Sequence, residues 1–514
     1  MPTGATETRQ VEAIVLDNEF VAATFVPELG GRLLSLVDKT TSLNCFDGEL
    51  SKPEQLGAFG FGGLEVTLDG HRRANALGPV RAALTDTGLR LSEVGARGGI
   101  GFDLIASLGE GAELCLEVRF RNRTLHAVSW NPGLLWSDHG WDVSTSAQAA
   151  IVYSEAHQAG FAIVHDPNML RQSSVSAATC YADLRTLPPR WGETLRLSIV
   201  PVSGLGRPRQ VTPVAALGMS DTELVIQPRR RVPGVKLVLQ TQEGKTLEAP
   251  AELAPDTILK YTFEELGGNP NAFVILDADR AEVFRFPAEP PAPSTLPNPI
   301  GYPEPPPSDL TQWEREPAYR YWVANLKTRA AFRASDFAGA YGHAENALLY
   351  NGDDPLAWIE KAIAARHLGE VDDNAPELPN AHYLAPLEPL LRAEGFLAQT
   401  GLDGRTFLAP LAEQPGELVE VACTYVELGL FEDAARFIDA ALTVTDVPML
   451  RFLYAYVCLV TGKMKADAAS AVSAVKRAEP PYPWRPVERT ALAELNRTFP
   501  KQPILEQYLG LVGE

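Results

Sequence analysis

Two clusters in the first third of the chain carry the side chains that could do chemistry. The first runs from Phe61 to Arg73 and places carboxylates, an imidazole and guanidinium groups in a glycine-rich stretch: Glu65, Asp69, His71, Arg72 and Arg73. The second runs from Trp130 to Asp142 and sets three of the chain's eight tryptophans among amide, acidic and imidazole groups: Trp130, Asn131, Trp136, Asp138, His139 and Trp141. Together the clusters offer an aromatic surface and groups that can bind hydroxyls and move protons.

A sugar ligand requires this combination of side chains. The C–H face of a sugar ring stacks on an indole, while its hydroxyl groups need polar partners such as carboxylates and amides. Catalysis at an anomeric centre also needs an acid/base pair, commonly a carboxylate with a histidine or a second carboxylate. We therefore predict that Glu65 and His71 are catalytic. The predicted substrate contacts are Asp69, Arg72, Trp130, Asn131, Trp136, His139 and His165.

Each of these residues also has a structural interpretation, which the sequence leaves open. Trp130 and Trp136 could fill a hydrophobic core, and Glu65 could be a structural acid. His165 begins the run His-Asp-Pro-Asn, which is first of all a turn signal. The arginine triplet 229–231 is interpreted as a solvated turn, with binding of an anionic sugar substituent as the alternative.

The composition argues against several other classes of function. With 65 Asp and Glu against 45 Lys and Arg, the net charge of -20 disfavours nucleic acid and anionic membranes as partners. The sequence has no phosphate loop, dinucleotide fingerprint or metalloprotease motif, and its five cysteines lack CxxC spacing, so we expect no cofactor and no metal. A signal-peptide pattern and a membrane-length apolar run are also missing, which predicts a cytoplasmic protein.

The residues up to position 286 have the two-residue period of β-strands. In Leu114–Arg121, apolar residues alternate with glutamate and arginine, which predicts a strand with one buried and one charged face. Further short strands, separated by turn residues, are predicted at 20–26, 33–37, 89–91, 195–199 and 235–240. Many short strands without a long amphipathic helix predict a large antiparallel assembly of two sheets over residues 1–286.

A proline-rich segment and then a helical period follow. Because proline fixes φ and lacks an N–H, the prolines of residues 287–307 predict an extended linker. Residues 308–514 have apolar positions three and four apart, and Gly429 and Gly462 are 33 residues apart, close to the ~34-residue tetratricopeptide period. We predict an α-solenoid of helix pairs, which either only packs on the β domain or offers a face to a protein partner.

The motifs of the β half resemble those of a known superfamily. The run Asn18–Asp38, with its Pro-Glu-Leu-Gly-Gly turn, resembles the opening of galactose-mutarotase-like (aldose 1-epimerase-like) proteins. With Gly62–Glu65, Gly70-His71, Arg121–Thr124 and the tetratricopeptide-like tail, the chain is similar to a bacterial branch of that superfamily, a domain of unknown function. The resemblance covers residues 11–286.

The resemblance implies a β-supersandwich with a sugar-sized cleft on its concave sheet. In mutarotases a histidine donates a proton to the ring oxygen and a glutamate removes the proton of the anomeric hydroxyl. Glu65 and His71 match the motifs of this branch best, and the segment 130–139 would line the cleft. The catalytic His and late Glu motifs of the epimerases themselves are missing from this chain.

Two functions follow from these observations. The first is a carbohydrate-active protein that binds and processes a neutral mono- or oligosaccharide as a glycoside hydrolase or epimerase, with Glu65 and His71 as the acid/base pair. The second is a non-catalytic sugar sensor or scaffold, in which the β domain binds the sugar and the helical tail recruits a protein partner.

Overall fold

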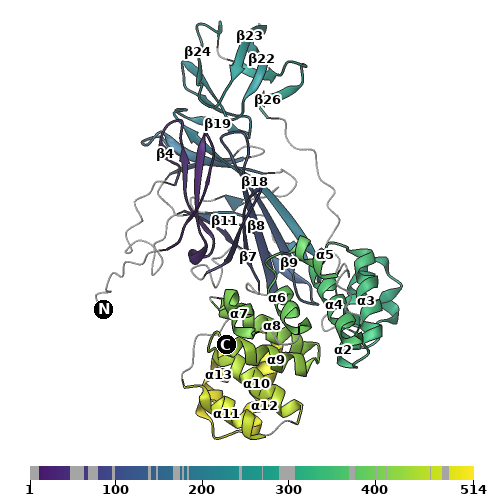
Figure 1. Ribbon diagram of the computed structural model, residues 1–514. Helices are drawn as coiled ribbons and strands as arrows, with labels where there is room; N and C mark the ends of the chain where they lie inside the picture. The colour runs from purple at the N-terminus through teal and green to yellow at the C-terminus, as the bar shows by residue number, and fades with distance from the viewer. Residues whose placement is uncertain are drawn as a thin grey trace, which may run out of the picture.

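The structure of the chain is a computed structural model, in which a β-rich first part precedes a helical tail (Figure 1). The residues that it describes are 11–46, 63–67, 79–94, 99–136, 141–145, 149–165, 174–175, 179–181, 185–241, 246–268, 270–288, 302, 307–369, 377–399, 403–412, 414–462, 465–476 and 485–513. Most of the segment for which a proline-rich linker is predicted lies outside these residues.

Two large antiparallel sheets form most of the β-rich part. The first has the strand order β1 (Ile14–Asp17), β2 (Val21–Val26), β3 (Arg32–Asp38), β5 (Leu64–Thr67), β11 (Gly133–Trp136), β16 (Thr179–Tyr181) and β15 (Ser174–Val175), with β4 (Leu43–Asn44) beside β3. The second has the order β12 (Asp142–Thr145), β13 (Ala149–Ser154), β14 (Ala159–His165), β18 (Gly192–Ser203), β9 (Leu114–Asn122), β8 (Ile100–Leu108), β7 (Gly88–Glu93) and β6 (Arg81–Thr85). A short ribbon pairs β10 (Val128–Trp130) with β17 (Arg185–Leu187).

The two large sheets enclose one hydrophobic core, as the alternating sequence pattern predicts. Along β9 the side chains alternate strictly between buried and half-buried, with Leu116, Val118 and Phe120 pointing into the core. Phe25 of β2 and Leu64 of β5 reach the same core from the opposite sheet. For β9 the period-two signal therefore identified both the strand and the face that it buries.

A smaller pair of four-stranded sheets follows, which the sequence pattern did not separate from the large ones. One sheet contains β19 (Pro208–Val211), β20 (Ala215–Met219), β21 (Glu223–Pro228) and β24 (Leu259–Thr262). The other contains β23 (Thr246–Leu253), β22 (Val232–Thr241), β25 (Pro270–Leu276) and β26 (Glu282–Phe286). The small sheets have their own core, in which Phe273 stacks on Phe284 with ring centroids 5.6 Å apart.

A buried polar network joins the small sheets to the large ones. The Arg229 guanidinium is fully buried, forms an ion pair with Asp38 of β3 at 3.2 Å, and donates a hydrogen bond to Gln227 at 2.8 Å and another to the carbonyl of Pro201. Asp38 also accepts a hydrogen bond from the hydroxyl of Ser203 at 3.0 Å. The interpretation of the arginine triplet as a solvated turn is therefore wrong for Arg229, because its charge is needed by a buried carboxylate.

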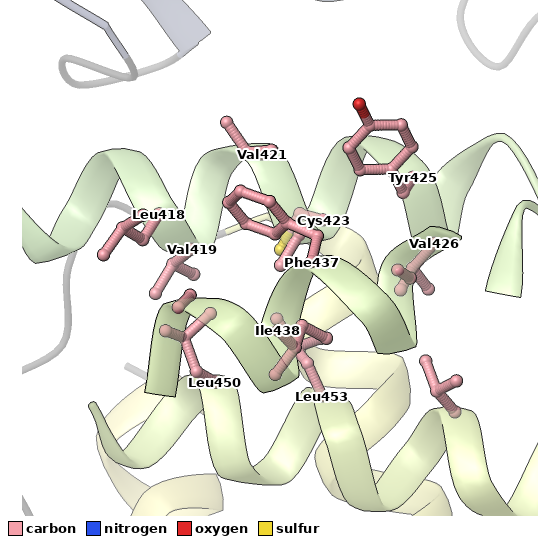
Figure 2. Close-up of a cluster of buried hydrophobic side chains, with 14 of the residues drawn as sticks. Leu418, Val419, Val421, Cys423, Tyr425, Val426, Phe437, Ile438, Leu450 and Leu453 are labelled. Atoms are coloured by element: carbon pink, nitrogen blue, oxygen red, sulfur yellow. The ribbon is translucent and has the colours of Figure 1, made fainter. Parts of the chain in front are cut away.

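The tail is a stack of helices whose buried apolar side chains form one large core and one small separate cluster. Its α-helices are α1 (Thr311–Glu314), α2 (Arg320–Arg333), α3 (Phe337–Tyr350), α4 (Pro355–Leu368), α5 (Glu377–Leu384), α6 (Pro389–Ala398), α7 (Gly404–Leu408), α8 (Pro415–Glu427), α9 (Phe431–Leu442), α10 (Pro448–Val460), α11 (Lys465–Ala474), α12 (Pro486–Thr498) and α13 (Pro503–Gly513). Figure 2 shows how side chains of α8, α9 and α10, among them Leu418, Phe437 and Leu450, meet in this core. Within the described residues, no helix combines the length and the apolar composition that crossing a membrane requires.

Local sequence signals explain where the helices begin and end. The side chain of Asp354 accepts a hydrogen bond from the backbone N–H of Leu356 and so caps the start of α4, while Pro448 begins α10, where its missing N–H costs nothing. The two glycines that set the repeat period, Gly429 and Gly462, both follow helices in the left-handed conformation, with φ of 77° and 67°. The helical spacing of apolar residues predicted for 308–514 is confirmed, for example in α8 and α9.

The helical tail docks on the β-rich part through charged and aromatic side chains. Arg123, next to the end of β9, donates two hydrogen bonds to Glu388 at 2.5 and 3.1 Å. The indole N–H of Trp322 in α2 donates to the carbonyl of Leu125 at 2.9 Å. Figure 1 shows α4, α5 and α6 lying near the ends of β7, β8 and β9. The contact between the two parts therefore includes buried charged groups, each of which needs a partner of opposite charge on the other part.

Candidate functional site

Glu65, the predicted catalytic carboxylate, lies on β5 in the middle of the first large sheet. Its neighbours Leu64 and Val66 point into the core between the sheets, so Glu65 points to the opposite face. There it forms an ion pair with Arg32 of β3, and both side chains are at most 2% exposed. Gly63 makes this approach of β5 to β3 possible, because a Cβ at its φ of 85° would lie 2.3 Å from the carbonyl oxygen of Leu33.

Four other residues predicted for this site lie outside the described residues, namely Asp69, His71, Arg72 and His139. The acid/base pair of Glu65 and His71 therefore stays a prediction. Among the described residues, Glu65 pairs with the guanidinium of Arg32, which places a donor of positive charge on the carboxylate.

The two tryptophans predicted to stack on a sugar belong to the core between the large sheets. Trp130 is 1% exposed and packs on Phe120 with ring centroids 4.6 Å apart. Trp136 is 5% exposed and meets Phe161 edge to face at 5.6 Å. Their burial matches the core-filling alternative, because neither indole offers an open ring face to a ligand. Asn131 and His165 are half-buried at the ends of strands.

A cleft on the outer face of the second large sheet brings together residues that the sequence analysis did not select. The register of the strands sets Arg90 of β7, Ile105 of β8, Glu117 of β9 and Arg196 of β18 side by side in one row. Because alternate residues share a face, Arg119 stands in the next row beside Asp103 and Thr194. The cavity above these rows has a volume of about 580 Å³ and is closed on one side by α5 and the segment after α3. We call it the sheet cleft.

The charged groups of the sheet cleft are arranged in pairs. Glu117 accepts a hydrogen bond from Arg119 at 2.5 Å and another from Arg196 at 3.2 Å. Partial burial acts to raise the pKa of Glu117, but these two guanidiniums outweigh it and hold the pKa of the carboxyl below its ordinary value. Glu117 is therefore ionised at neutral pH and acts as a hydrogen-bond acceptor rather than as a general acid.

Aromatic side chains stand at the edge of the sheet cleft. Trp191, in the turn before β18, is 42% exposed, and Tyr321 of α2 packs edge to face against it with ring centroids 5.9 Å apart. Tyr383 of α5 is 85% exposed. Arg90 ties the same helix to the sheet, because it donates hydrogen bonds to Asp103 at 3.0 Å and to the carbonyl of Leu384 at 2.9 Å. The cleft therefore has an indole that a ligand can reach, held in place by the helical tail.

The charge of the sheet cleft differs from that of the whole molecule. Its lining contains five arginines, namely Arg90, Arg119, Arg121, Arg190 and Arg196. Three carboxylates accompany them, namely Glu117, Glu193 and Asp353. Two of the arginines are also paired outside the lining, Arg90 with Asp103 and Arg190 with Glu360, so the cleft lacks the excess of negative charge that the whole chain carries.

Metal chemistry finds no support in the described part of the chain. Across those residues, no three histidine, cysteine, aspartate or glutamate side chains gather closely enough to hold a metal ion. The polar groups of the sheet cleft are mostly guanidiniums, which carry only donors and cannot ligate a cation.

Comparison with known proteins adds fold likenesses only. No family model and no curated protein matches the chain. Among solved structures, a galactose mutarotase-like protein from Lactobacillus casei has a TM-score of 0.28 and 8% identity, over 37% of this chain and 100% of that one. A putative aldose 1-epimerase from Klebsiella pneumoniae has a TM-score of 0.24 and 9% identity, over 36% of this chain and 78% of that one. A TPR-domain containing protein from Parabacteroides distasonis has a TM-score of 0.27 and 11% identity, over 96% of this chain and 88% of that one.

The fold class predicted from the sequence is confirmed. The strands of the first part form antiparallel sheets, and the tail is helical. The domain boundaries at 286 and 307 stay predictions, although the last strand ends at Phe286 and the first helix begins at Thr311.

Proposed function

We propose that this chain is a carbohydrate-binding protein whose ligand occupies the sheet cleft. The observation that carries the proposal is Trp191, an indole 42% exposed at the edge of a cavity of about 580 Å³. Cavities of this size suit ligands from a monosaccharide to a short oligosaccharide. Tyr321 supports the indole from the side, so its ring is preorganised for stacking.

The polar groups of the sheet cleft suit the hydroxyls of a sugar. Glu117 offers acceptor oxygens, and Arg119 and Arg196 offer donors in a planar array beside it. Of two neighbouring hydroxyls of a sugar ring, one can donate a hydrogen bond to the carboxylate while the other accepts one from a guanidinium. Uronic acids are candidate ligands beside neutral sugars, because their carboxylate could accept a hydrogen bond from Arg121, whose buried Nη1 has no partner among the described residues.

The state of Glu117 favours binding over processing of the sugar. A general acid works best when its pKa lies near the operating pH, whereas two arginines hold the pKa of Glu117 below its ordinary value. A hydrolase or epimerase function through Glu65 and His71 is the second candidate. Glu65 lies on a different sheet from the sheet cleft, so it cannot act on a sugar bound there, and His71 lies outside the described residues.

Sugar binding can be tested on the full chain with variants of exposed cleft residues. We expect one of D-glucose, D-galactose, maltotriose and D-galacturonate to raise the melting temperature of the wild type, because a ligand that binds only the native state stabilises it. Trp191→Ala should raise the dissociation constant of that sugar at least about tenfold, as measured by isothermal titration calorimetry. A loss of this size is typical when a tryptophan that a ligand covers is removed. Trp191→Phe, which keeps a ring face, should lose less.

Two further variants locate the site. Arg196→Gln should weaken binding, while Arg207→Gln should not, although both arginines are equally exposed, at 72% and 71%, and both pair with a glutamate. If Glu65→Gln abolishes binding and Trp191→Ala leaves it unchanged, the site lies on the first sheet as the sequence predicted. If no sugar binds the wild type, the proposal of a carbohydrate-binding protein fails.

A further inference from the structure

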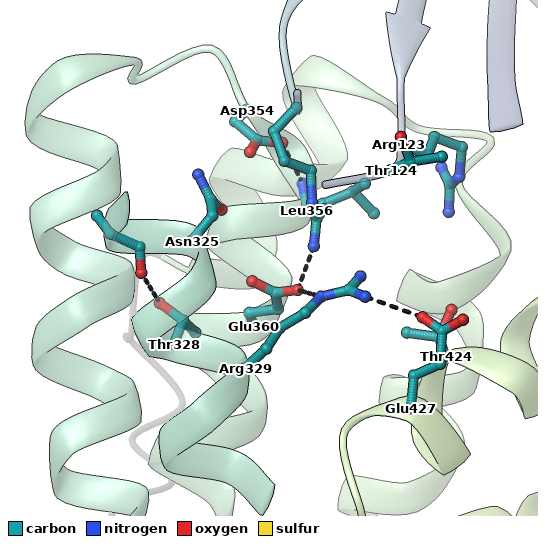
Figure 3. Close-up of polar contacts among 12 residues, drawn as sticks. Arg123, Thr124, Asn325, Thr328, Arg329, Asp354, Leu356, Glu360, Thr424 and Glu427 are labelled. Carbon is teal, nitrogen blue, oxygen red and sulfur yellow. Dashed lines mark hydrogen bonds and ion pairs between the residues drawn. The ribbon is translucent and has the colours of Figure 1, made fainter. Parts of the chain in front are cut away.

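A second cavity, of about 640 Å³, lies where the β-rich part meets the helical tail. We call it the junction cavity. Its walls come from the segment after β9, from Arg190 before β18, from α2, α4 and α8, and from the start of α12. Figure 3 shows one side of it, with Arg329 of α2 reaching between Glu360 of α4 and Glu427 of α8. Segments far apart in the sequence therefore contribute charged groups to one space.

Arginines dominate the lining of the junction cavity. Five of them line it, namely Arg123, Arg190, Arg329, Arg333 and Arg485. The carboxylates that line it are Glu360, Glu420 and Glu427. Further acceptors contribute, since Glu388 outside the lining accepts two hydrogen bonds from Arg123 and the backbone carbonyl of Glu427 accepts one from Arg333. A guanidinium carries five N–H groups, and within the described residues several buried nitrogens of these arginines still have no acceptor.

Arg190 shows this shortage of acceptors most clearly. Its side chain is 1% exposed and donates one hydrogen bond, from Nη2 to Glu360. Within the described residues, its Nε and Nη1 atoms are buried and have no hydrogen-bond partner. A buried charged N–H group without a hydrogen-bond partner costs free energy, because it has lost its hydration. An acceptor that enters the cavity from solution would form the missing hydrogen bonds.

Other arginines of the cavity share the shortage. The Nε of Arg329 lies 3.6 Å from Glu360, and the Nε of Arg123 lies 3.5 Å from Glu420, both too long for a well-formed hydrogen bond. Counted over the described residues, the cavity arginines have five buried nitrogens without a hydrogen bond, against two such carboxylate oxygens, on Glu360 and Glu420. The unpaired groups are mainly donors, which the several acceptor oxygens of an anion can satisfy with charge-assisted hydrogen bonds.

The arginines of the cavity differ in their electrostatics: burial lowers the pKa of Arg190, but the charges of Glu360 and Asp354 outweigh it and raise that pKa. Burial lowers the pKa of Arg329, and the positive charge of Arg190 lowers it further, ahead of the opposing effect of Glu427. Burial also lowers the pKa of Arg485 to about 10, and Arg123 acts in the same direction against Glu488. Like charges therefore face one another across the cavity, a situation that a bound anion would relieve.

We propose that the junction cavity binds a small metabolite through an oxoanion group, phosphate or carboxylate, held by Arg190, Arg329 and Arg485. Planar guanidiniums bind both kinds of group in bidentate fashion. Because the arginines come from the β-rich part and from two regions of the tail, the bound anion would fasten the tail to the sheets. The proposal concerns a cavity separate from the sheet cleft, although Arg190 lines both.

The experiment uses inorganic phosphate and citrate as probes on the full-length protein. Each is titrated calorimetrically in the low-millimolar range at constant ionic strength, with chloride as the balancing anion. We expect saturable binding of at least one probe, and the one that binds distinguishes a phosphate ligand from a carboxylate ligand. Thr490, an exposed residue of α12 that lines the cavity, allows the site to be blocked without disturbing the core.

Thr490→Glu adds a carboxylate to the cavity and should weaken binding of the probe at least about tenfold. Thr490→Gln, which has nearly the same shape and no charge, should bind within about twofold of wild type. Trp191→Ala should also leave binding unchanged, because Trp191 does not line this cavity. The proposal is overturned if neither probe binds the wild type, or if Thr490→Glu binds the probe as well as Thr490→Gln does.

Discussion

Arg229→Ala is expected to lower the free energy of unfolding by about 3–5 kcal/mol, because it removes one partner of a fully buried ion pair. Asp38 would then keep a buried negative charge that accepts hydrogen bonds from the hydroxyls of Ser203 and Thr40 but has lost its cationic partner Arg229. Gln227 and the carbonyl of Pro201 would also lose a donor. Equilibrium urea unfolding followed by tryptophan fluorescence measures the loss.

The chain supplies a matched control two residues away. Arg231 has the same side chain but is exposed, so Arg231→Ala should change the free energy of unfolding by no more than about 0.5 kcal/mol. Arg229→Lys should fall between the two variants, since it keeps the charge but loses the planar array of donors. A loss below about 1 kcal/mol in Arg229→Ala would show that the network does not hold the small sheets to the large ones.

The arginine triplet also shows how far sequence patterns reach. Periodicity predicted β9 and α8 because each buries one face, and burial of one face leaves a regular trace in the sequence. Arg229 is buried in an ion pair with Asp38, which is 191 residues away in the sequence, and no local sequence pattern indicates so distant a partner. The same holds for Trp130, whose burial depends on the opposite sheet rather than on its neighbours along the chain.

The sheet cleft was missed for a related reason. The alternation in β9 predicted that Glu117 and Arg119 share an outer face, but a single strand cannot tell whether that face meets solvent or a ligand. The decisive information is the register, which places Arg196 beside Glu117, together with the docking of α5 over the sheet.

The interface between the sheets and the tail also predicts how stability depends on pH. Glu417 of α8 is buried against the β-rich part, where it pairs with Arg81 of β6 at 2.6 Å. Burial raises the pKa of Glu417 to about 7, despite the opposing charge of Arg81, and Glu388 acts in the same direction as burial. Burial likewise raises the pKa of Glu488 to about 7. Both carboxyls thus prefer to be protonated in the folded protein.

The direction of the pH effect follows from these raised values. A carboxyl whose folded pKa exceeds its unfolded pKa contributes its full stabilisation below the unfolded value, and loses it as the pH rises through the folded value. For Glu417 the window runs from about 4.5 to about 7, and the corresponding change is up to about 3 kcal/mol. We therefore expect the free energy of unfolding to be lower at about pH 8 than at about pH 5.

Glu417→Gln isolates the contribution of this one carboxyl. The variant cannot ionise, so its stability should fall less steeply than that of the wild type between about pH 5 and pH 8, whatever its absolute stability. Glu494→Gln serves as the control, because Glu494 lies on the surface of α12 in an exposed pair with Arg497, and its slope should match that of the wild type. Urea unfolding at several pH values gives the three slopes. Equal slopes for Glu417→Gln and wild type would mean that Glu417 stays ionised at the interface and that its pairing with Arg81 outweighs its burial.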